Sequence, residues 1–491
     1  MPANEPPSEP RRLDHWEPIE AWQPWRPTRE QPWNLRWAAH LLRRAAFGFP
    51  AQRADEDAWA SLNRVVKQGP GATLDELFQP ADAAFNEMVD AAGQSITPEN
   101  DPDELRGWWL YRMLNSPQPL QERMALFWHN HFATSVNKVR RTQWMFQQNC
   151  TLREHALGKF EPLVLAMSHD PAMIVWLDLQ RNVKGYANEN FGRELMEVFT
   201  LGVGNYTEND VRAMARAFTG WRTVNDQFEF NSRLHDEGSK TLFGRTGNFD
   251  GDDAVRILLK QPAAARFIVR KLFRQLVSEA ESPSDALLDP LVDEFRRSSL
   301  DIGPTVRRIL SSRLFFSDTA YRQRIKSPVE FLIGAVIGLG ATSPMQRLVS
   351  LMEGLGQDLF APPNVKGWEG GKAWLNTATL LARDNLIWAL VGLPADRKPQ
   401  PAAPAGYRPS TESDTSEFCY PAGLAKSHAG DDPSAQVGFL VDLFLQGDLA
   451  EPAEKQLVEY TNKNAPKDAA WDRRLRETLH MLLVLPEYQL G

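Results

Sequence analysis

Apolar residues recur at helical spacing along almost the whole of this chain. Leu35, Ala38, Leu42 and Ala45 follow one another at intervals of three and four, which is the pattern of one face of an α-helix. Alternating apolar and polar residues, the mark of half-buried strands, occur almost only in QFEFNSRL from Gln227. The periodicity therefore predicts an all-α fold, a large multi-helix globular body with long loops and one possible small β-hairpin.

The same periodicity, read with the positions of glycine and proline, sets the expected helix boundaries. A first helix begins after Asn34 and ends before Gly48. Further helices are expected at residues 102–115, 119–132, 143–158, 171–179, 189–201, 208–219, 252–260, 262–278, 285–298, 303–313, 327–340, 345–358 and 372–392, with three more between 436 and 488.

Composition divides the chain into four regions. Residues 1–34 are rich in proline and tryptophan and predict an extended N-terminal arm that wraps a larger body, or alternatively a disordered tail. Residues 35–393 form the helical main body, and the Pro/Ser-rich residues 394–435 form a loop or linker. Residues 436–491 would bury a thin core alone, so we expect these C-terminal helices to dock on the main body.

The bulk composition excludes several classes of protein. The net charge is −8, so no overall basic field attracts nucleic acid. The longest apolar run, FLIGAVIGLGA from Phe331, is far shorter than the roughly 20 residues of a membrane-spanning helix. The N-terminus MPANEPPSEPRRLDHWEP has no apolar signal core, so the chain as written is expected to be cytoplasmic, or exported if a leader has been removed.

The stretch NENFGRELMEVFTLGVGNYTENDVRAMARAFTGW, from Asn188, predicts two capped helices in a tight hairpin. Glu189 and Arg193 form an i, i+4 pair on the first helix. Glu194 and Glu197 lie on its polar face, where they form solvated salt bridges or, alternatively, hold a metal ion, because carboxylates at i and i+3 project together.

Histidines are concentrated between residues 129 and 235. His129 and His131 point about 200° apart on a helix, so they face one ion only on an extended segment. His131 shares an apolar stripe and is either a hydrogen-bonded core residue or a ligand. His169 precedes a helix that Asp170 caps, and a second His–Asp pair, His235–Asp236, falls in a turn-rich loop; the list of candidate catalytic residues is His169, Asp170, His235 and Asp236.

The glycine-rich segment PPNVKGWEGGKAW, from Pro362, carries two tryptophans and Lys366. Such a loop could line a ligand or glycan surface, because indole rings stack on sugar faces. It could equally be a loop held in place by buried indoles. The predicted ligand-binding residues are Trp221, Lys366, Trp368 and Trp374.

Several long motifs in fixed order resemble one known family. FWHNHFATS, HDPAMIVWLD, the Asn188–Trp221 stretch, HDEGSKTLFG, RIKSPVEFLIGAV and PPNVKGWEGGKAWLNTATLLARDN are similar to the bacterial domain-of-unknown-function family numbered 1800, from about Leu35 to the closing LPEYQ. The resemblance implies that the C-terminal helices belong to the main body, and it implies no settled activity. It also implies an export signal and a sulfatase-like partner protein, although this N-terminus lacks a recognisable leader.

Three functions remain open from the sequence. The first is an enzyme or binding protein with a divalent metal ion in a polar His/carboxylate cleft; the predicted metal ligands are His129, His131, Glu189 and Glu194. The second is a non-catalytic module that binds a partner protein or glycan through its Trp-rich arm and loop. The third is metal-free acid–base catalysis by a His–Asp pair.

Overall fold

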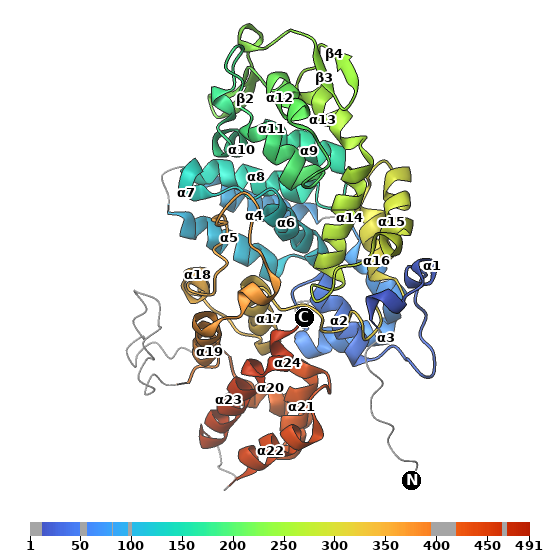
Figure 1. The fold of residues 1–491 in the computed structure, drawn as a ribbon. Coiled ribbons are helices and arrows are strands. Elements are labelled where there is room, and N and C mark those ends of the chain that lie inside the picture. Colours follow the sequence, from blue (N-terminus) through green and yellow to red (C-terminus); the bar gives the residue numbers. More distant parts are fainter. Residues whose placement is uncertain (1–11, 50–55, 81, 97–100, 394–418, 464–468) are drawn as a thin grey trace.

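The computed structural model describes residues 12–49, 56–80, 82–96, 101–393, 419–463 and 469–491. Helices dominate these residues, and the described strands form two small antiparallel two-stranded sheets (Figure 1). The all-α prediction is therefore confirmed, and the strand expected from Gln227 is present as β2 (Gln227–Phe230). The second of the two sheets was not expected.

The first part of the chain includes the helix that carries His129 and His131. Its elements are η1 (Leu13–His15), α1 (Pro18–Ala21), α2 (Leu35–Ala45), α3 (Ala58–Leu77), α4 (Ala83–Gln94), α5 (Pro102–Asn115), α6 (Pro119–His131), α7 (Val136–Val139), α8 (Thr142–Glu154), α9 (Phe160–His169) and α10 (Pro171–Trp176). Proline occupies the first helical position of α5 and α6, where a missing N–H costs nothing.

The middle of the chain forms the end of the molecule that carries both sheets (Figure 1). Its elements are η2 (Leu179–Arg181), α11 (Asn190–Glu194), the π-helical turn η3 (Leu195–Thr200), α12 (Glu208–Ala217), β1 (Trp221–Val224), β2 (Gln227–Phe230), η4 (Ser232–Leu234), β3 (Lys240–Leu242), β4 (Arg245–Gly247) and α13 (Gly251–Leu259). β1 pairs with β2 in a register that sets Trp221 opposite Phe230. Asn225 and Asp226 make this two-residue hairpin turn with positive φ angles, which these residue types tolerate.

The last part of the chain supplies the remaining helices. They are α14 (Pro262–Leu276), α15 (Asp285–Arg297), α16 (Ile302–Leu310), α17 (Pro328–Leu339), α18 (Met345–Met352), η5 (Gly371–Trp374), α19 (Thr377–Leu390), α20 (Pro421–Ala429), α21 (Pro433–Leu445), α22 (Glu451–Asn462), α23 (Ala469–Val484) and α24 (Pro486–Gln489). Ser327 and Glu330 close a capping box at the start of α17, next to the pocket described below.

The described part of the N-terminal segment lies against α15, α16 and the loop that follows α16. Trp22 is fully buried, and its Nε1–H donates a hydrogen bond of 2.6 Å to the Leu287 carbonyl. The ring of Trp25 stacks on Phe316 with centroids 4.5 Å apart. Because buried indoles contribute large apolar areas, this segment is part of the folded core. It contains η1 and α1, so it is less extended than expected, and residues 1–11 of the predicted arm lie outside the described residues.

The C-terminal helices α20–α23 form a cluster at the opposite end from the sheets, and the chain then returns to the middle of the body (Figure 1). Ile325 pairs with Leu490 in an isolated β-bridge, and Arg383 donates a 3.0 Å hydrogen bond to the Gln489 side chain. α20 lies within the segment predicted as a loop or linker, 394–435; residues 394–418 of that segment lie outside the described part.

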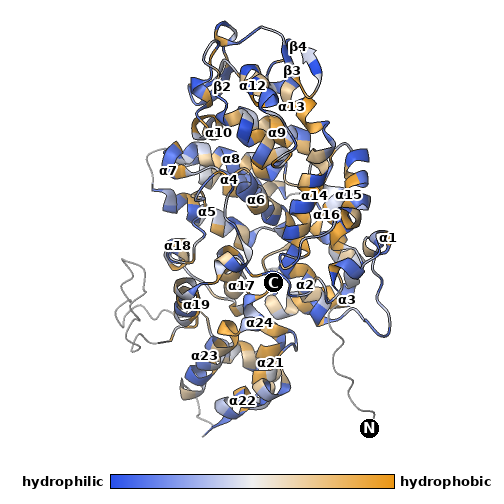
Figure 2. Ribbon diagram, viewed as in Figure 1, coloured by the Kyte–Doolittle hydropathy of each residue, from blue (hydrophilic) through white to orange (hydrophobic). Residues whose placement is uncertain are grey.

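Polar and apolar residues share most helices (Figure 2). The most apolar predicted run forms α17, which packs inside the body with Phe331 and Ile333 fully buried. Over the described ranges, no helix combines the length and the apolar character that crossing a bilayer requires.

Candidate functional site: a polar pocket at the centre of the body

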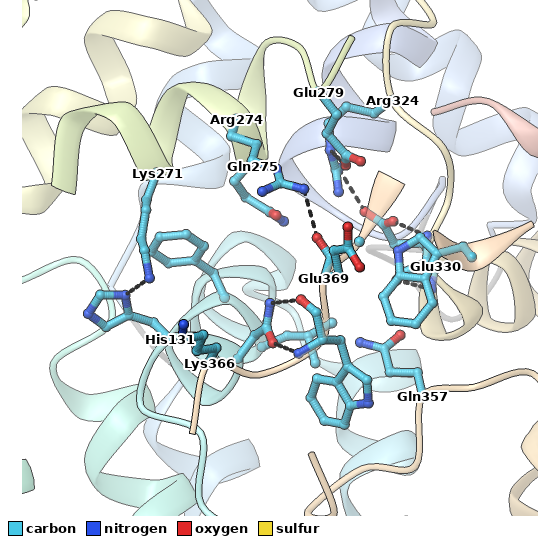
Figure 3. Close-up of a pocket in the computed structure, with 17 residues that line it drawn as sticks. His131, Lys271, Arg274, Gln275, Glu279, Arg324, Glu330, Gln357, Lys366 and Glu369 are labelled. Carbon is cyan, nitrogen blue, oxygen red and sulfur yellow. Dashed lines mark hydrogen bonds and ion pairs between the residues drawn. The ribbon is translucent and has the colours of Figure 1, made fainter. Parts of the chain in front are cut away.

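A pocket of about 150 Å³ opens at the centre of the body, where α6, α14, the start of α17 and the glycine-rich loop between α18 and α19 meet. Figure 3 shows Lys271 pointing toward His131 on one side of the pocket, whereas the other side groups Arg274, Glu279, Arg324, Glu330 and Glu369. Four residues predicted from the sequence line it: His131, Lys366, Trp368 and Trp374. The other lining residues are Leu126, Phe127, Asn130, Lys271, Arg274, Gln275, Glu279, Arg324, Ser327, Glu330, Gln357, Glu369 and Gly370.

The glycine-rich loop is fastened to α6 by one side chain. Asn130 Oδ1 accepts a 2.7 Å hydrogen bond from the Trp368 N–H, and Asn130 Nδ2 donates to the Trp368 carbonyl at 3.3 Å (Figure 3). Gly367 has a φ of +78° and approaches Asn130 so closely that a Cβ atom there would overlap both its side chain and its carbonyl. Glycine at position 367 is therefore a geometric requirement of this wall.

Trp368 and Trp374 are each only 7% exposed. The loop is thus held by buried indoles, as one of the two sequence interpretations expected, while both residues also border the pocket. Since little of either ring surface is open, the pair does not offer a broad stacking platform. Their contribution to the pocket is to exclude water from one side of it.

His131, the last residue of α6, connects the pocket to the π-helical turn η3. Its Nε2 lies 2.9 Å from the Phe199 carbonyl. Its Nδ1 lies 3.0 Å from Lys271 Nζ (Figure 3). A carbonyl only accepts, so Nε2 carries the ring proton and Nδ1 accepts from the lysine. Lys271 also reaches the Val198 carbonyl at 3.4 Å. The π-helical turn therefore presents two carbonyls to the pocket side chains, and π-turns are frequent at functional sites.

Burial controls the charge of this pair. Desolvation, followed by the neighbouring Arg274, lowers the pKa of Lys271 from 10.5 to about 8. Desolvation and the charge of Lys271 hold the pKa of His131 well below its usual value, so the imidazole is neutral. A lysine that loses its proton near neutral pH is typical of reactive sites.

The floor of the pocket is a network of buried charges. Arg324 pairs with Glu279 at 2.7 Å and with Glu330 at 3.0 Å, and Arg123 pairs with Glu330 from beneath. A Cβ atom at Gly371 would lie 2.8 Å from Glu279 Oε2, so the loop closes directly over this carboxylate. Each floor carboxylate is thus neutralised by an arginine, which buried charges require.

The cations around the opening are arranged differently. Lys271, Arg274 and Lys366 line the pocket, and none of them has a carboxylate within 4.0 Å among the residues that the structure describes. Arg274 donates instead to the Glu369 carbonyl at 2.7 Å. The Glu369 side chain is likewise outside ion-pair distance of any described cation, so the opening keeps more positive than negative unpaired charge.

A family model described as "Protein of unknown function (DUF1800)" matches residues 40–490, nearly the whole chain. The chain belongs to the DUF1800 family. The resemblance drawn from the motifs is thereby confirmed. No curated protein and no solved structure matches the chain significantly. Since the family's description names no activity, the chemistry of this DUF1800 protein has to be argued from its own residues.

The four predicted metal ligands of this DUF1800 protein do not meet at one point. His129 Nε2 accepts a 3.1 Å hydrogen bond from the Phe360 N–H, and burial lowers the pKa of His129 to about 3. Glu189 pairs with Arg193 at 3.1 Å. Burial, followed by the charge of Glu197, raises the pKa of Glu194, which lies within electrostatic range of Lys366 at the pocket. Within the described ranges, no three His, Cys, Asp or Glu residues are grouped to hold a metal ion.

The His169–Asp170 pair is separated in the structure. His169 Nε2 lies 2.9 Å from an Asp252 oxygen, and its ring stacks on Phe228 with centroids 4.3 Å apart. Asp170 is the N-cap of α10 and accepts hydrogen bonds from the Met173 N–H and the Gln148 side chain. Burial raises the pKa of Asp170 to about 7. Each residue has its own partners, and neither lines the central pocket.

The His235–Asp236 pair is also divided. His235 Nδ1 lies 2.9 Å from the Thr219 carbonyl, whereas Asp236 forms a 2.7 Å ion pair with Arg216. The hydrogen bond from Arg216 lowers the pKa of Asp236 to about 2. Trp221 is buried at the base of the β1–β2 hairpin, away from the residues that line the pocket. These side chains hold the sheet region of the DUF1800 protein in place.

Sequence reasoning missed the charged wall contributed by α14. Lys271, Arg274 and Gln275 stand at i, i+3 and i+4 of RFIVRKLFRQLVSE, so they share one polar face of a helix. That spacing could have predicted a polar helix face that lines a pocket. The pairing of Arg324 with Glu279 and Glu330 had no local signal, because it joins residues 45 and 6 positions apart across two elements.

Proposed function

We propose that this protein binds a small organic oxyanion, a molecule that carries a carboxylate, sulfate or phosphate group, in the central pocket. The observation that carries the proposal is the trio of lining cations Lys271, Arg274 and Lys366, which have no carboxylate partner among the described residues. Cationic side chains that converge without counterions favour an anion, and charge-assisted hydrogen bonds to it are the strong kind.

The volume of the pocket favours a small ligand. A volume of about 150 Å³ suits a molecule about as large as benzene. Arg274 and Lys366 are exposed at the opening, whereas Lys271 and His131 lie deeper. A ligand therefore meets the exposed cations first and the more deeply placed Lys271 last, so long-range attraction acts before the desolvated contacts form.

The buried floor of the pocket favours a ligand whose inner end is neutral and polar. Glu279 and Glu330 are already neutralised by Arg324 and Arg123, so the floor adds no strong field of either sign. Ser327 and Gln357 add neutral hydrogen-bonding groups to the lining. A ligand with one anionic end and one neutral polar end matches this division between the opening and the floor.

Two lysines on the same loop provide a matched test. Lys366 lines the pocket, whereas Lys372 is exposed on η5 and does not. Thermal unfolding of wild type, Lys366→Met and Lys372→Met should be followed with acetate, pyruvate, sulfate and phosphate at constant ionic strength. We expect at least one anion to raise the Tm of wild type and of Lys372→Met, with the rise reduced in Lys366→Met.

An equal effect on all three proteins would contradict the proposal. If every anion shifts the Tm of all three proteins equally, the effect is general salt stabilisation and the proposal fails. Constant ionic strength matters because surface charges on this acidic protein are screened over about 10 Å at 0.1 M salt.

A further inference from the structure

We infer that Lys271 is a reactive amine that forms an imine with the carbonyl group of a small 2-oxo acid bound in the central pocket. This inference rests on the proposed oxyanion site and names its substrate class: a carboxylate attached directly to a ketone or aldehyde carbon. It adds a covalent step to the binding function.

The first support is the position of the amine. Lys271 Nζ reaches the pocket from α14 and is oriented by two acceptors, His131 Nδ1 at 3.0 Å and the Val198 carbonyl at 3.4 Å. Both acceptors are neutral. In the described structure no carboxylate holds this ammonium in an ion pair, so deprotonation breaks no salt bridge.

The second support is the set of groups that face Lys271. On its own helix lie Arg274 and the ring of Phe267, whose centroid is 4.9 Å from Nζ. His131 faces it from α6 and Val198 faces it from η3. Burial and the charge of Arg274 favour the uncharged amine and lower the pKa of Lys271 to about 8, although the Phe267 ring and the two acceptors favour the ammonium. Desolvation beside another cation is a known way to activate a lysine nucleophile.

The third support is the placement of the other cations. Arg274, one helical turn from Lys271, and Lys366, on the facing loop, line the same small cavity. A carboxylate held by these two residues keeps the attached carbonyl carbon inside the pocket, where Lys271 is the other lining amine. A 2-oxo acid of a few heavy atoms fits the volume of about 150 Å³.

The chemical step balances without an added oxidant or reductant. The neutral amine nitrogen forms a bond to the carbonyl carbon, and the carbonyl oxygen takes up protons and leaves as water. Overall, the lysine ammonium and the carbonyl compound give a protonated imine and one water molecule, so atoms and charge are conserved. His131 acts as a positioning residue here, because its Nδ1 accepts a hydrogen bond from the amine while Nε2–H is fixed on Phe199.

The test is reductive trapping on the full chain. Wild-type protein is incubated with pyruvate at pH 7.5, treated with sodium borohydride, digested and analysed by mass spectrometry for carboxyethyl-lysine. Because an exposed lysine has a pKa of about 10.4, it holds far less neutral amine at this pH, and we expect Lys271 to be modified at least ~10-fold more than Lys372. Lys271→Arg keeps a cation and its hydrogen bonds but forms no imine, so it should bind pyruvate and show no modification above the level of exposed lysines.

The outcomes separate the inference from the proposed function. Stabilisation of wild type by pyruvate with equal labelling of Lys271 and Lys372 overturns the imine and leaves the oxyanion site standing. Stabilisation by acetate or sulfate but not by pyruvate does the same. No stabilisation by any anion, with no selective labelling, removes both. Selective labelling of Lys271 that persists after Lys366→Met supports the amine and assigns carboxylate binding to Arg274.

Discussion

The lowered pKa of Lys271 predicts how the free energy of unfolding of this protein changes with pH. The pKa of Lys271 is lowered from 10.5 to about 8 by burial and by Arg274, so the folded state disfavours the ammonium. Each pKa unit corresponds to 1.36 kcal/mol, and the charged lysine therefore costs the fold roughly 3 kcal/mol at pH 7. Replacing it by methionine removes this cost while keeping the apolar stem.

The sign of the effect follows from proton counting. Below pH 8 both the folded and the unfolded wild-type chain carry the lysine proton, and the cost is fully present. Between pH 8 and pH 10.5 the unfolded chain holds more protons at this site, so wild-type stability rises with pH relative to the variant. Above pH 10.5 the contribution has disappeared.

Urea unfolding of wild type and Lys271→Met at pH 7 and pH 10.5 measures this difference. The variant also loses the hydrogen bonds to His131 and Val198. The part of that loss that depends on the lysine charge is already contained in the pKa shift, and the remainder is equal at both pH values and cancels. We expect the free energy of unfolding of the variant, relative to wild type, to fall by about 2–3 kcal/mol from pH 7 to pH 10.5. A difference that does not change with pH would refute the buried, proton-releasing lysine.

Three further changes test other parts of the structure. Asn130→Ala removes both hydrogen bonds to the Trp368 backbone; it should cost about 1–3 kcal/mol and speed limited proteolysis of the glycine-rich loop, and an unchanged cleavage rate would contradict this. Asp170→Asn keeps the cap but not the charge. Because the pKa of Asp170 is raised to about 7, the free energy of unfolding of wild type falls as pH rises from about 4 to 7. In urea unfolding, the variant should therefore be more stable relative to wild type at pH 8 than at pH 5. An equal difference between the two proteins at both pH values would contradict the raised pKa. Trp22→Ala should cost about 3–5 kcal/mol, since the ring is fully buried and bonded to Leu287, and an unchanged Tm would mean that the N-terminal segment does not belong to the core.

Much of the fold could be predicted because many helices begin at residues whose effect depends only on their neighbours in the sequence. The capping box at Ser327, the Asp170–Pro171 helix start and the periodic stripe after Asn34 each act within one or two helical turns. The pattern failed between residues 56 and 96, where α3 and α4 were not expected. α3 contains Gly69 with φ +87° followed by Pro70, and such a break hides helical periodicity.

The π-helical turn marks a second limit of pattern reading. Residues 189–201 were expected to form one regular helix, but the chain changes from α11 to η3 at Leu195. The carbonyls of Val198 and Phe199 are satisfied by Lys271 and His131, residues 73 and 68 positions away. A turn that depends on such distant donors has no signature in its own sequence.

The site could be predicted only in part. The glycine-rich loop was singled out for its residue types, and five of its residues line the pocket, including the predicted Lys366, Trp368 and Trp374. The histidine pairs were singled out for sequence proximity to aspartates, but the structure gives His169 and His235 partners other than those neighbours. Sequence proximity of two ionisable residues says little about their contact when one of them caps a helix, as Asp170 does, because the cap geometry turns its side chain toward the backbone.

The most direct test of the central claim is a crystal structure of the protein with selenate, a sulfate analogue that can be located by anomalous scattering. We expect an anomalous peak in the central pocket within hydrogen-bond distance of Lys271, Arg274 or Lys366, and its loss in Lys366→Met crystals of the same form. Selenate found only at other surfaces, with the pocket holding water alone at saturating concentration, would contradict the proposal that this pocket recognises oxyanions.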